Sequence, residues 1–285
     1  MERERWLKVY QLLLRLDDGN SRGVFTAAAV LAVFFWAVIY DRPVSWACRR
    51  GCWPDDLRPN RLPSQSTMSR RLRDPQVLAL QQRVEDLFKQ PRFDSRCRTT
   101  CIDGKPLPIG GCSKDRQANW GRGARSWCRG YKLYAIWGAE CFPRAWRVAA
   151  MGQSEQSMAE IMIPELRGHG WLLGDKLYDI NKLYDAAARV GYQLLAPRKR
   201  PQARLARYRH SPSRLRGLAL LETDWGQRVY ARRTHIERCF AGLTSNGGGL
   251  TVLPPWVRTL PRVRLWVHAK LILNALRLAP NRASS

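Results

Sequence analysis

Hydrophobic positions follow two different patterns along this chain, and the pattern changes near residue 95. Before that point, apolar residues run together in VFTAAAVLAVFFWAVIY (24–40) or recur at helical spacing between Val77 and Phe88. After it, short runs of β-branched and apolar residues alternate with polar ones, as they do in strands. The patterns predict an all-helical domain over residues 1–94, followed by an α/β domain over residues 95–280.

Two short helices separated by a tight break are predicted within the helical region. The segment PSQSTMSRRL (63–72) has Ser64 as a plausible N-cap, and Asp-Pro at 74–75 begins the next helix. The pair resembles a helix-turn-helix module, in which Arg70 and Arg71 would contact DNA. A plain helical cap packed on the second domain explains the same pattern, and both interpretations stay open.

The apolar run at 24–40 also has two interpretations. Its 17 residues carry no charge but lie at the lower limit for a membrane span, and Asp-Arg-Pro at 41–43 ends the run sharply. We predict a buried helix of a small all-helical domain and no membrane partner. A membrane-anchored basic protein is the alternative, which rests on this run alone.

Three strands are predicted at the start of the second domain: RCRTTCIDG (96–104), GYKLYAIWGAE (130–140) and PRAWRVAAMG (143–152). The elements predicted after them are a helix (154–166), a strand (170–175), a helix (181–191), a strand (192–197), a helix (226–244) and a closing helix (262–278). Strands joined by short links pair antiparallel, whereas a strand reached across a helix is parallel to its neighbour. This order predicts a mixed sheet flanked by helices.

Composition adds a strong positive charge. The chain has 49 Lys and Arg against 23 Asp and Glu, which gives a net charge of +26 and a pI of about 10.7. Most of the excess lies after residue 94, where the net charge is +21. Such an excess predicts a polyanionic partner, with nucleic acid first and an anionic membrane surface second. Lys199 and Arg200 begin a stretch (198–216) that is predicted, with 228–238, to hold the DNA backbone.

Eight cysteines are present, at positions 48, 52, 97, 101, 112, 128, 141 and 239. Their spacing includes no C-x2-C pair and no His partner at zinc-ligand distance, so the sequence does not indicate a structural zinc site. With no signal peptide visible, reduced thiols in the cytoplasm are the simplest interpretation.

Three carboxylates stand where α/β enzymes place catalytic groups. Asp103 lies in the first strand within CIDGKPL, Asp175 ends the fourth within LLGDKLYD, and Glu237 lies on the late helix. The strand ends of open α/β sheets converge on one crevice. Carboxylates are the ligands that Mg²⁺ and Mn²⁺ prefer, and two such ions can hold both the attacking and the leaving oxygen of a phosphodiester. The set predicts a site for one or two Mg²⁺ or Mn²⁺ ions.

Each carboxylate also has a purely structural interpretation. Asp103 precedes a glycine and is a plausible turn residue, Asp175 can cap the following helix, and Glu237 can pair with Arg233 four residues earlier. Taken as an ordered set within this frame of strands and helices, the three favour a metal site.

The late helix carries a pattern of its own in YARRTHIE (230–237). Tyr230, Arg233 and Glu237 are spaced i, i+3 and i+7, so on one regular α-helix they share a face, and position 244 shares it too. A Tyr and an Arg beside a metal-binding Glu are predicted to bind DNA, by touching phosphate or stacking on a base.

These motifs resemble bacterial insertion-sequence transposases of the DDE superfamily, in particular the IS-four and IS-five-like group with a transposase DDE domain. On its last catalytic helix that group carries a Tyr, two residues, an Arg, three residues, a Glu, six residues and a Lys, and YARRTHIE matches this as far as Glu237. IDGKPL is similar to its first motif, with Asp103, and LLGDKLYD to its second, with Asp175. SKDRQA and RGYKLYAIW also resemble segments of this group. The resemblance spans about residues 95–280.

The resemblance implies a ribonuclease-H-like catalytic fold with Asp103, Asp175 and Glu237 as catalytic metal ligands. It implies metal-dependent cleavage and transfer of DNA strands at the inverted repeats that end an insertion sequence. Water would attack the phosphodiester at the element end, and the freed 3′-hydroxyl would then attack target DNA. Double-stranded DNA would be the partner, a homodimer or larger synaptic complex the assembly, and the bacterial cytoplasm, in association with the nucleoid, the location.

One position departs from the family pattern. Where the group has its Lys, this chain has Thr244, which offers a neutral hydrogen bond in place of a cationic DNA contact. The difference keeps a second function open, that of a non-catalytic DNA-binding protein derived from a transposase. The three acids are intact, which favours the catalytic function.

Overall fold

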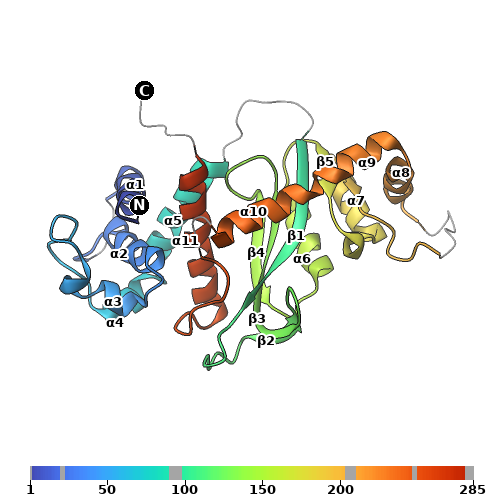
Figure 1. Cartoon of the computed structure of the whole chain (residues 1–285). Helices are drawn as coiled ribbons and strands as arrows, with labels where there is room; N and C mark the ends of the chain where they lie inside the picture. Colours follow the sequence, from blue (N-terminus) through green and yellow to red (C-terminus); the bar gives the residue numbers. More distant parts are fainter. Residues whose placement is uncertain (1, 20–22, 90–97, 203–209, 246–248, 280–285) are drawn as a thin grey trace. The chain divides into compact units, whose positions relative to one another are not determined.

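The computed structural model describes residues 2–19, 23–89, 98–202, 210–245 and 249–279. These residues fall into two compact units (Figure 1). The first unit joins residues 1–90 to residues 243–250 and 265–285, and the second consists of residues 91–242 and 251–264. The domain boundary predicted between residues 94 and 95 lies outside the described residues.

Helices make up the described part of the first unit. They are α1 (Glu2–Leu16), α2 (Ala27–Ile39), α3 (Val44–Ala47), the 3-10 turn η1 (Arg50–Cys52), α4 (Gln65–Arg71), α5 (Pro75–Lys89) and the C-terminal part of α11 (Leu260–Leu278). The predicted start of α4 is confirmed, because Ser64 Oγ accepts a hydrogen bond from the backbone N–H of Thr67 at 3.2 Å. Pro75 begins α5, where its missing N–H costs no hydrogen bond.

The core of the first unit is built on α2 and three tryptophans. Trp36 and Trp53 stack with ring centroids 4.5 Å apart, and Trp6 meets both edge-on. Each indole N–H donates to a backbone carbonyl, so the rings are buried without losing a hydrogen bond. Eleven of the thirteen residues of α2 are buried, which confirms the prediction of a buried helix. Among the described residues, every helix is too short or too polar to cross a membrane.

Two contacts between side chains tie α11 into the first unit. His268 Nε2 lies 2.8 Å from Glu85 Oε2 of α5, and Lys270 Nζ lies 2.6 Å from Asp41 Oδ1 after α2. Lys270 is almost fully buried and its ammonium also lies over the ring of Trp266, 5.4 Å from the centroid. These contacts explain why the end of the chain belongs to the first unit.

A six-stranded mixed sheet forms the centre of the second unit. Its strands are β1 (Arg98–Pro108), β2 (Asn119–Arg122), β3 (Trp127–Trp137), β4 (Ala145–Ala150), β5 (Gly170–Leu173) and β6 (Tyr192–Leu195). The order is β2-β3-β1-β5-β6, and β4 also pairs with β3. β1, β2 and β4 are each antiparallel to β3, whereas β5 is parallel to both β1 and β6. The predicted mixed sheet is confirmed; the short strand β2 was not predicted.

The helical elements of the second unit are α6 (Glu155–Met162), η2 (Ile163–Glu165), η3 (Lys176–Tyr178), α7 (Asn181–Arg189), α8 (Pro212–Leu221), α9 (Asp224–Tyr230), η5 (Ala231–Arg233), α10 (Thr234–Ser245) and the start of α11. Sequence reasoning missed α8, which lies partly within the basic stretch 198–216. Ser211 caps it by accepting from the N–H of Arg214, and Pro212 is its first residue. That Ser-Pro pair is the signal that could have found the helix.

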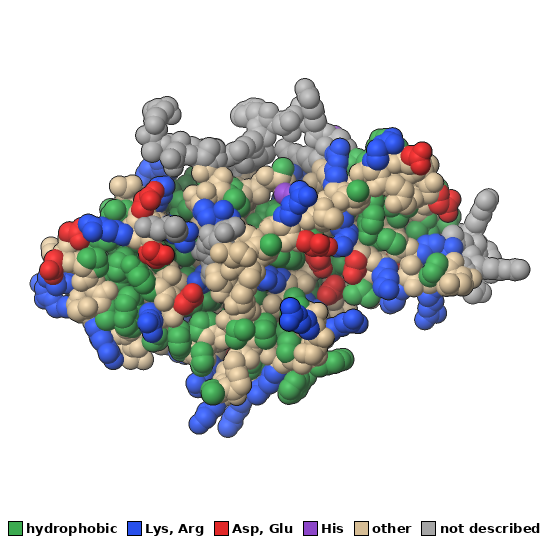
Figure 2. Space-filling model, in the orientation of Figure 1, with side chains coloured by type: hydrophobic (Ala, Val, Ile, Leu, Met, Phe, Trp, Pro, Cys, Tyr) green, Lys and Arg blue, Asp and Glu red, His purple; other side chains and the backbone are tan. Residues whose placement is uncertain are grey.

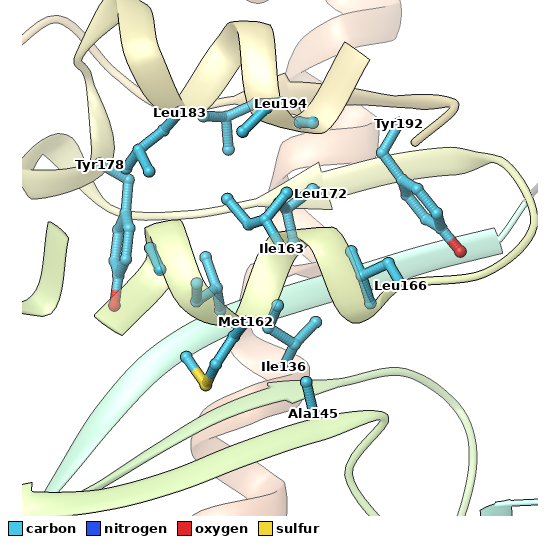
Figure 3. Packing of buried hydrophobic residues seen from close by; sticks show 14 of the residues in the cluster. Ile136, Ala145, Met162, Ile163, Leu166, Leu172, Tyr178, Leu183, Tyr192 and Leu194 are labelled. Atoms are coloured by element: carbon cyan, nitrogen blue, oxygen red, sulfur yellow. The ribbon is translucent and has the colours of Figure 1, made fainter. Parts of the chain in front are cut away.

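One face of the sheet packs against α6 and α7 (Figure 3). Ile136 of β3, Leu172 of β5 and Leu194 of β6 meet Met162 of α6 and Leu183 of α7 in this core, and all five are almost fully buried. Burying side chains of this size contributes about 1.5–3 kcal/mol each. The core therefore fixes the parallel strands β5 and β6 against β1 and β3.

The opposite face of the sheet carries α10. Trp137 of β3 contacts Phe240 of α10 edge-on, with centroids 6.3 Å apart, and His235 Nε2 lies 2.6 Å from the carbonyl oxygen of Gly138. Residues of a strand alternate between the faces, so Trp137 points to α10 while Ile136 points to the core. The two faces thus have different partners.

The late helix predicted over 226–244 is not continuous. The structure divides it into α9, the 3-10 turn η5 and α10. Thr234 Oγ1 donates to the carbonyl oxygen of Ala231 at 3.3 Å, a local side-chain bond that competes with regular helical pairing. The prediction of one regular helix is therefore wrong between Tyr230 and Thr234.

Candidate active site

Asp103 projects from β1 on the same face of the sheet as α10. Cys101, two positions earlier on that face, donates its Sγ–H to the carbonyl oxygen of Arg232 at 3.7 Å. Asp103 follows, with its Oδ2 3.8 Å from Nη1 of Arg233. Because β1 continues to Pro108, the interpretation of Asp103 as a turn residue is wrong.

Asp175 lies just beyond the end of the neighbouring parallel strand. The paired register of β1 and β5 ends at Cys101 and Leu173, and Asp103 and Asp175 each follow two residues later on their own chain segment. The negative charge of Asp175 acts on Asp103, which indicates that the two carboxylates lie near each other. Asp175 also caps the turn η3, where its Oδ1 accepts from the N–H of Leu177 at 2.7 Å. The capping role considered for Asp175 is therefore real and coexists with its place in the site.

The electrostatics show that these carboxylates lie close to other acids. Burial, together with the negative charges of Glu155 and Asp175, raises the pKa of Asp103 to about 6. Burial and the charge of Glu155 also raise the pKa of Asp175. Each carboxylate accepts one backbone N–H, which offsets only part of the effect. A site of this kind favours a bound cation, because a cation would relieve the repulsion.

Glu237 occupies a different environment from the two aspartates. Its Oε1 accepts from Nη2 of Arg233 at 2.8 Å, and 57% of its side chain is exposed. Arg233 thus lies between the two motifs, with one nitrogen on Glu237 and the other near Asp103. The ion pair considered as an alternative for Glu237 is present, and it links this residue to Asp103.

Tyr230 is fixed to the end of β5 rather than directed to solvent. Its hydroxyl donates to the carbonyl oxygen of Gly174 at 3.2 Å, and burial raises its pKa. Gly174 is the residue before Asp175, so this hydrogen bond holds the end of α9 beside the second aspartate. Tyr230 and Arg233 flank the carboxylates even though the helix between them is a 3-10 turn, because side chains three apart eclipse in that geometry.

Sequence reasoning missed a fourth acid, Glu155 at the first position of α6. Its Oε1 accepts from Lys132 Nζ at 2.9 Å, and its Oε2 accepts from the Tyr178 hydroxyl at 3.3 Å. Gly104, beside Asp103, leaves the space for this pair: a Cβ there would lie 2.8 Å from Lys132 Cδ and 3.3 Å from Glu155 Oε1. The glycine after the aspartate therefore makes room for a second charge pair and does not form a turn.

The donor set can be compared with the needs of a divalent ion. Two aspartates that lie near each other in a half-buried position offer the hard oxygen ligands that Mg²⁺ and Mn²⁺ prefer. Among the described residues, however, no group of three His, Cys, Asp or Glu side chains is assembled as a metal site. Glu237 is held by Arg233 instead of being turned to the aspartates. The residues present fit a divalent ion at Asp103 and Asp175. Glu237 is connected to them through Arg233, which contacts both Glu237 and Asp103.

The predicted DNA-binding arginines of the first unit differ in exposure. Arg70 is exposed. Arg71 is buried, where its guanidinium donates to Asp74 Oδ2 at 2.5 Å and to the carbonyl oxygen of Phe25 at 3.1 Å. A guanidinium engaged in this way is not presented to a phosphate, so we retain Arg70 alone as a predicted contact of α4.

The predicted contacts of the basic stretch are accessible where the structure describes them. Lys199 and Arg200 are both exposed. Arg214 of α8 is not, because it forms a two-point ion pair with the buried Asp179, with nitrogen–oxygen distances of 2.6 and 2.8 Å. The second acid of LLGDKLYD therefore has a structural role. Figure 2 shows acidic side chains gathered on the visible face with Lys and Arg around them.

A mixed sheet with one acid on a central strand and a second just after the neighbouring parallel strand is the arrangement of a ribonuclease-H-like domain. The family model described as "Transposase DDE domain" matches residues 95–253, more than half of the 285 residues, and the chain belongs to this family. No curated protein and no solved structure matches the chain.

Family membership confirms the resemblance to DDE transposases and gives the chain a transposase-type function. DNA is the substrate of such proteins, and they generally use divalent metal ions. The match does not test the IS-four and IS-five-like subgroup, and the individual site residues stay predictions.

Proposed function

We propose that this protein cleaves DNA strands at the inverted-repeat ends of an insertion sequence and joins them to target DNA. Asp103, Asp175 and Glu237 are the proposed catalytic residues and the ligands of one or two Mg²⁺ or Mn²⁺ ions. The observation that carries the proposal is the proximity of Asp103 on β1 to Asp175 just after β5, where burial and neighbouring negative charge raise the pKa of both carboxyl groups.

A divalent ion held by these carboxylates would supply the positive charge that stabilises the attacking and leaving oxygens of a phosphodiester. The chain's own residues prepare the place for it. The backbone N–H groups of Gly104 and Leu177 orient the two aspartates, and the core beneath β1 and β5 keeps the strands in register. Pre-organised ligands of this kind lose little freedom when they bind.

Arg233 has two roles in this proposal. It pairs with Glu237 and lies near Asp103, so it offsets part of their negative charge. If a cation were held by those carboxylates, the guanidinium would be able to bind a DNA phosphate through two parallel hydrogen bonds. Tyr230, held on Gly174, keeps the turn that carries Arg233 beside the strand end.

Glu155 is proposed as a positioning residue. It forms an ion pair with Lys132 and accepts a hydrogen bond from Tyr178, and its negative charge still raises the pKa of both aspartates. Its charge would strengthen the attraction for a cation without contacting the ion itself.

DNA would be held by exposed cations of both units. Arg70, Lys199 and Arg200 are the proposed contacts, and binding would weaken steeply as salt rises because phosphate contacts release counterions. Action on two element ends calls for a homodimer or larger synaptic complex. The proposed location is the bacterial cytoplasm, in association with the nucleoid.

A second candidate function is DNA binding without catalysis by a protein derived from a transposase. Two observations favour it. Thr244 stands where the family has Lys, and Glu237 is paired with Arg233 rather than grouped with the aspartates. Both functions share the DNA partner and differ in whether a strand is cut.

The deciding experiment is a cleavage and strand-transfer assay on DNA that flanks the gene, with Mg²⁺ or Mn²⁺. Asp103→Ala, Asp175→Ala and Glu237→Ala are compared with wild type and with Asp185→Ala, which removes an exposed carboxylate of α7. The proposal expects cleavage by wild type and Asp185→Ala alone. Equal cleavage by all variants would refute the site, and DNA binding without any cleavage by wild type would favour the second function.

A further inference from the structure

The edge of the antiparallel half of the sheet forms a surface that the proposed cleavage does not use. Residues 119–122 of β2 pair with residues 127–130 of β3, and we call this two-stranded segment the Trp–Arg ribbon. Its register places Trp120 opposite Arg129 and Arg122 opposite Trp127. Directly opposite residues point to the same side, as do residues two apart on one strand. All four side chains therefore lie on one face, with tryptophan and arginine alternating.

The other face of the ribbon explains why these side chains point outward. Gly121 and Cys128 occupy it, and Gly121 is buried. A Cβ at Gly121 would lie 2.7 Å from both the Cγ and the carbonyl oxygen of Met151. The glycine lets the ribbon lie directly on the chain after β4, so its inner face is closed and its outer face has no covering element among the described residues.

The two tryptophans of the ribbon are strongly exposed. Trp120 is 65% exposed and Trp127 is 71% exposed, compared with 44% for Trp225 and 38% for Trp256. Exposed large apolar side chains gathered in one place mark an interaction surface, because water contact with them is unfavourable. In Figure 2, hydrophobic and basic side chains appear together at the lower end of the view, where β2 and β3 lie in Figure 1.

The charge around the ribbon is of one sign. Between residues 116 and 139 the sequence contains no Asp or Glu, and Arg116, Arg122 and Arg125 are exposed. Arg129 is held in place by the carbonyl oxygens of Ala118 and Asp115. Basic side chains alternating with aromatic ones are the combination that binds single-stranded nucleic acid, since bases stack on the rings and phosphates pair with the cations.

We propose that the Trp–Arg ribbon binds unpaired nucleotides of DNA, with bases stacked on Trp120 and Trp127 and the backbone held by Arg122. A second copy of the chain is disfavoured as the occupant, because it would bring like charges together. Intact duplex does not satisfy the surface either, because its bases are already stacked and cannot reach the indoles. The inference does not require the carboxylate site to be active.

The test is a binding titration of full-length protein with a labelled oligothymidylate and, separately, with a duplex of equal length, in EDTA. Stacking on an aromatic side chain changes single-strand affinity by about tenfold per base. The variant Trp120→Ala/Trp127→Ala is therefore expected to bind the single strand at least about tenfold more weakly and the duplex within about twofold of wild type. Trp120→Phe/Trp127→Phe is expected to keep most of the single-strand affinity, because the ring is retained.

Two controls keep the test decisive. Trp225→Ala removes an indole of α9 that is 44% exposed, and it is expected to leave single-strand binding unchanged. The titration in EDTA measures binding alone, so a failure of the proposed cleavage would leave this result intact. Thermal unfolding of each variant shows whether its fold is retained, and the phenylalanine pair serves if the alanine pair does not fold.

Four outcomes would overturn the inference. They are no single-strand binding by wild type, unchanged single-strand binding by the alanine pair, an equal loss of single-strand binding in Trp225→Ala, and an equal loss of duplex binding in the alanine pair.

Two further measurements identify a different occupant. Loss of binding to vesicles of phosphatidylserine and phosphatidylcholine with DNA binding unchanged would assign the surface to membranes. A change of mass by light scattering with DNA binding unchanged would assign it to self-association.

Discussion

The parallel and antiparallel halves of the same sheet present two different kinds of chemistry. Where β1 and β5 run side by side, Asp103 and Asp175 meet in a half-buried place that resists their ionisation. At the antiparallel edge, Trp120 and Trp127 stand in solvent among arginines. The first half concentrates negative charge inside a positively charged protein, and the second exposes apolar rings.

The difference follows from how each half is connected. β5 ends beside β1 and is followed by the turn η3, so Asp175 comes near Asp103 from a distant part of the sequence. In the antiparallel pair of β2 and β3, side chains directly opposite or two apart lie on one face, so a row of them is exposed together. The carboxylate site is suited to a reaction at one phosphodiester, and the Trp–Arg ribbon is suited to contact along a nucleic-acid strand. The two proposals can therefore be separated by mutation.

The largest expected effect separates cutting from binding. Asp175→Asn should lower the rate of strand cleavage by at least about 10²–10³-fold while leaving DNA affinity nearly unchanged, because the carboxylate would hold the metal ion that acts on the reacting phosphate. Single-turnover cleavage at saturating DNA measures the first quantity and a binding titration the second. The matched variant Asp185→Asn should cut as wild type does. If Trp120→Ala/Trp127→Ala slowed single-turnover cleavage as much as Asp175→Asn, the two halves would not be independent.

The next effect concerns the support of the exposed edge. Gly121→Ala places a Cβ against Met151 backbone and should destabilise the second unit by about 1–3 kcal/mol, as overpacking does. Denaturant unfolding measures the change. Gly111→Ala is the control, because a Cβ there meets no atom within 4 Å. Equal stability of the two variants would show that β2 is not held against the chain after β4.

A pH-dependent effect tests the acid half. Asp103 has a pKa of about 6 in the folded protein against 3.8 for the free group, so its ionisation costs folding energy once the pH exceeds both values. In EDTA, Asp103→Asn should therefore stabilise the second unit by on the order of 1–3 kcal/mol at about pH 8 and give no gain at about pH 4. Unfolding curves at the two pH values measure this. A gain that does not vary with pH would contradict the assigned repulsion.

The smallest expected effect is on stability at Glu237. Because more than half of its side chain is exposed, its pair with Arg233 should contribute less than about 0.5 kcal/mol, and Glu237→Gln should unfold almost as wild type does. The same variant should lose cleavage activity if Glu237 is a metal ligand. A large loss of stability with cleavage intact would show that Glu237 acts only through its ion pair with Arg233.

Local signals predicted much of this fold. Ser64 and Pro75 begin helices where capping chemistry places them, and the spacing of strands and helices gave the mixed sheet. Asp103 and Asp175 were found because the motifs CIDGKPL and LLGDKLYD place them in a predicted strand and at the end of another. These features depend on a few neighbouring residues, so they can be predicted from a single sequence.

The features that were missed depend on distant residues. Glu155 joins the site through Lys132, 23 residues earlier, and Arg71 is buried by a carbonyl 46 residues away. β2 is four residues long and is a strand only because β3 pairs with it. The turn η5 contains no Gly or Pro to mark it, and only Thr234 gives a local reason for the break. Spacing alone could not supply these long-range partners.

The turn η5 also sets the direction around the helix axis in which the side chains after it point. A 3-10 turn advances about 120° per residue and an α-helix about 100°, so three residues in the tighter form rotate everything downstream by about 60°. Glu237 is therefore rotated by about one-sixth of a full turn around the helix axis from the position that a continuous helix from Tyr230 would give it. The backbone conformation of Ala231–Arg233 thus decides whether Glu237 points toward the aspartates or away from them, before its side-chain rotamer has any effect.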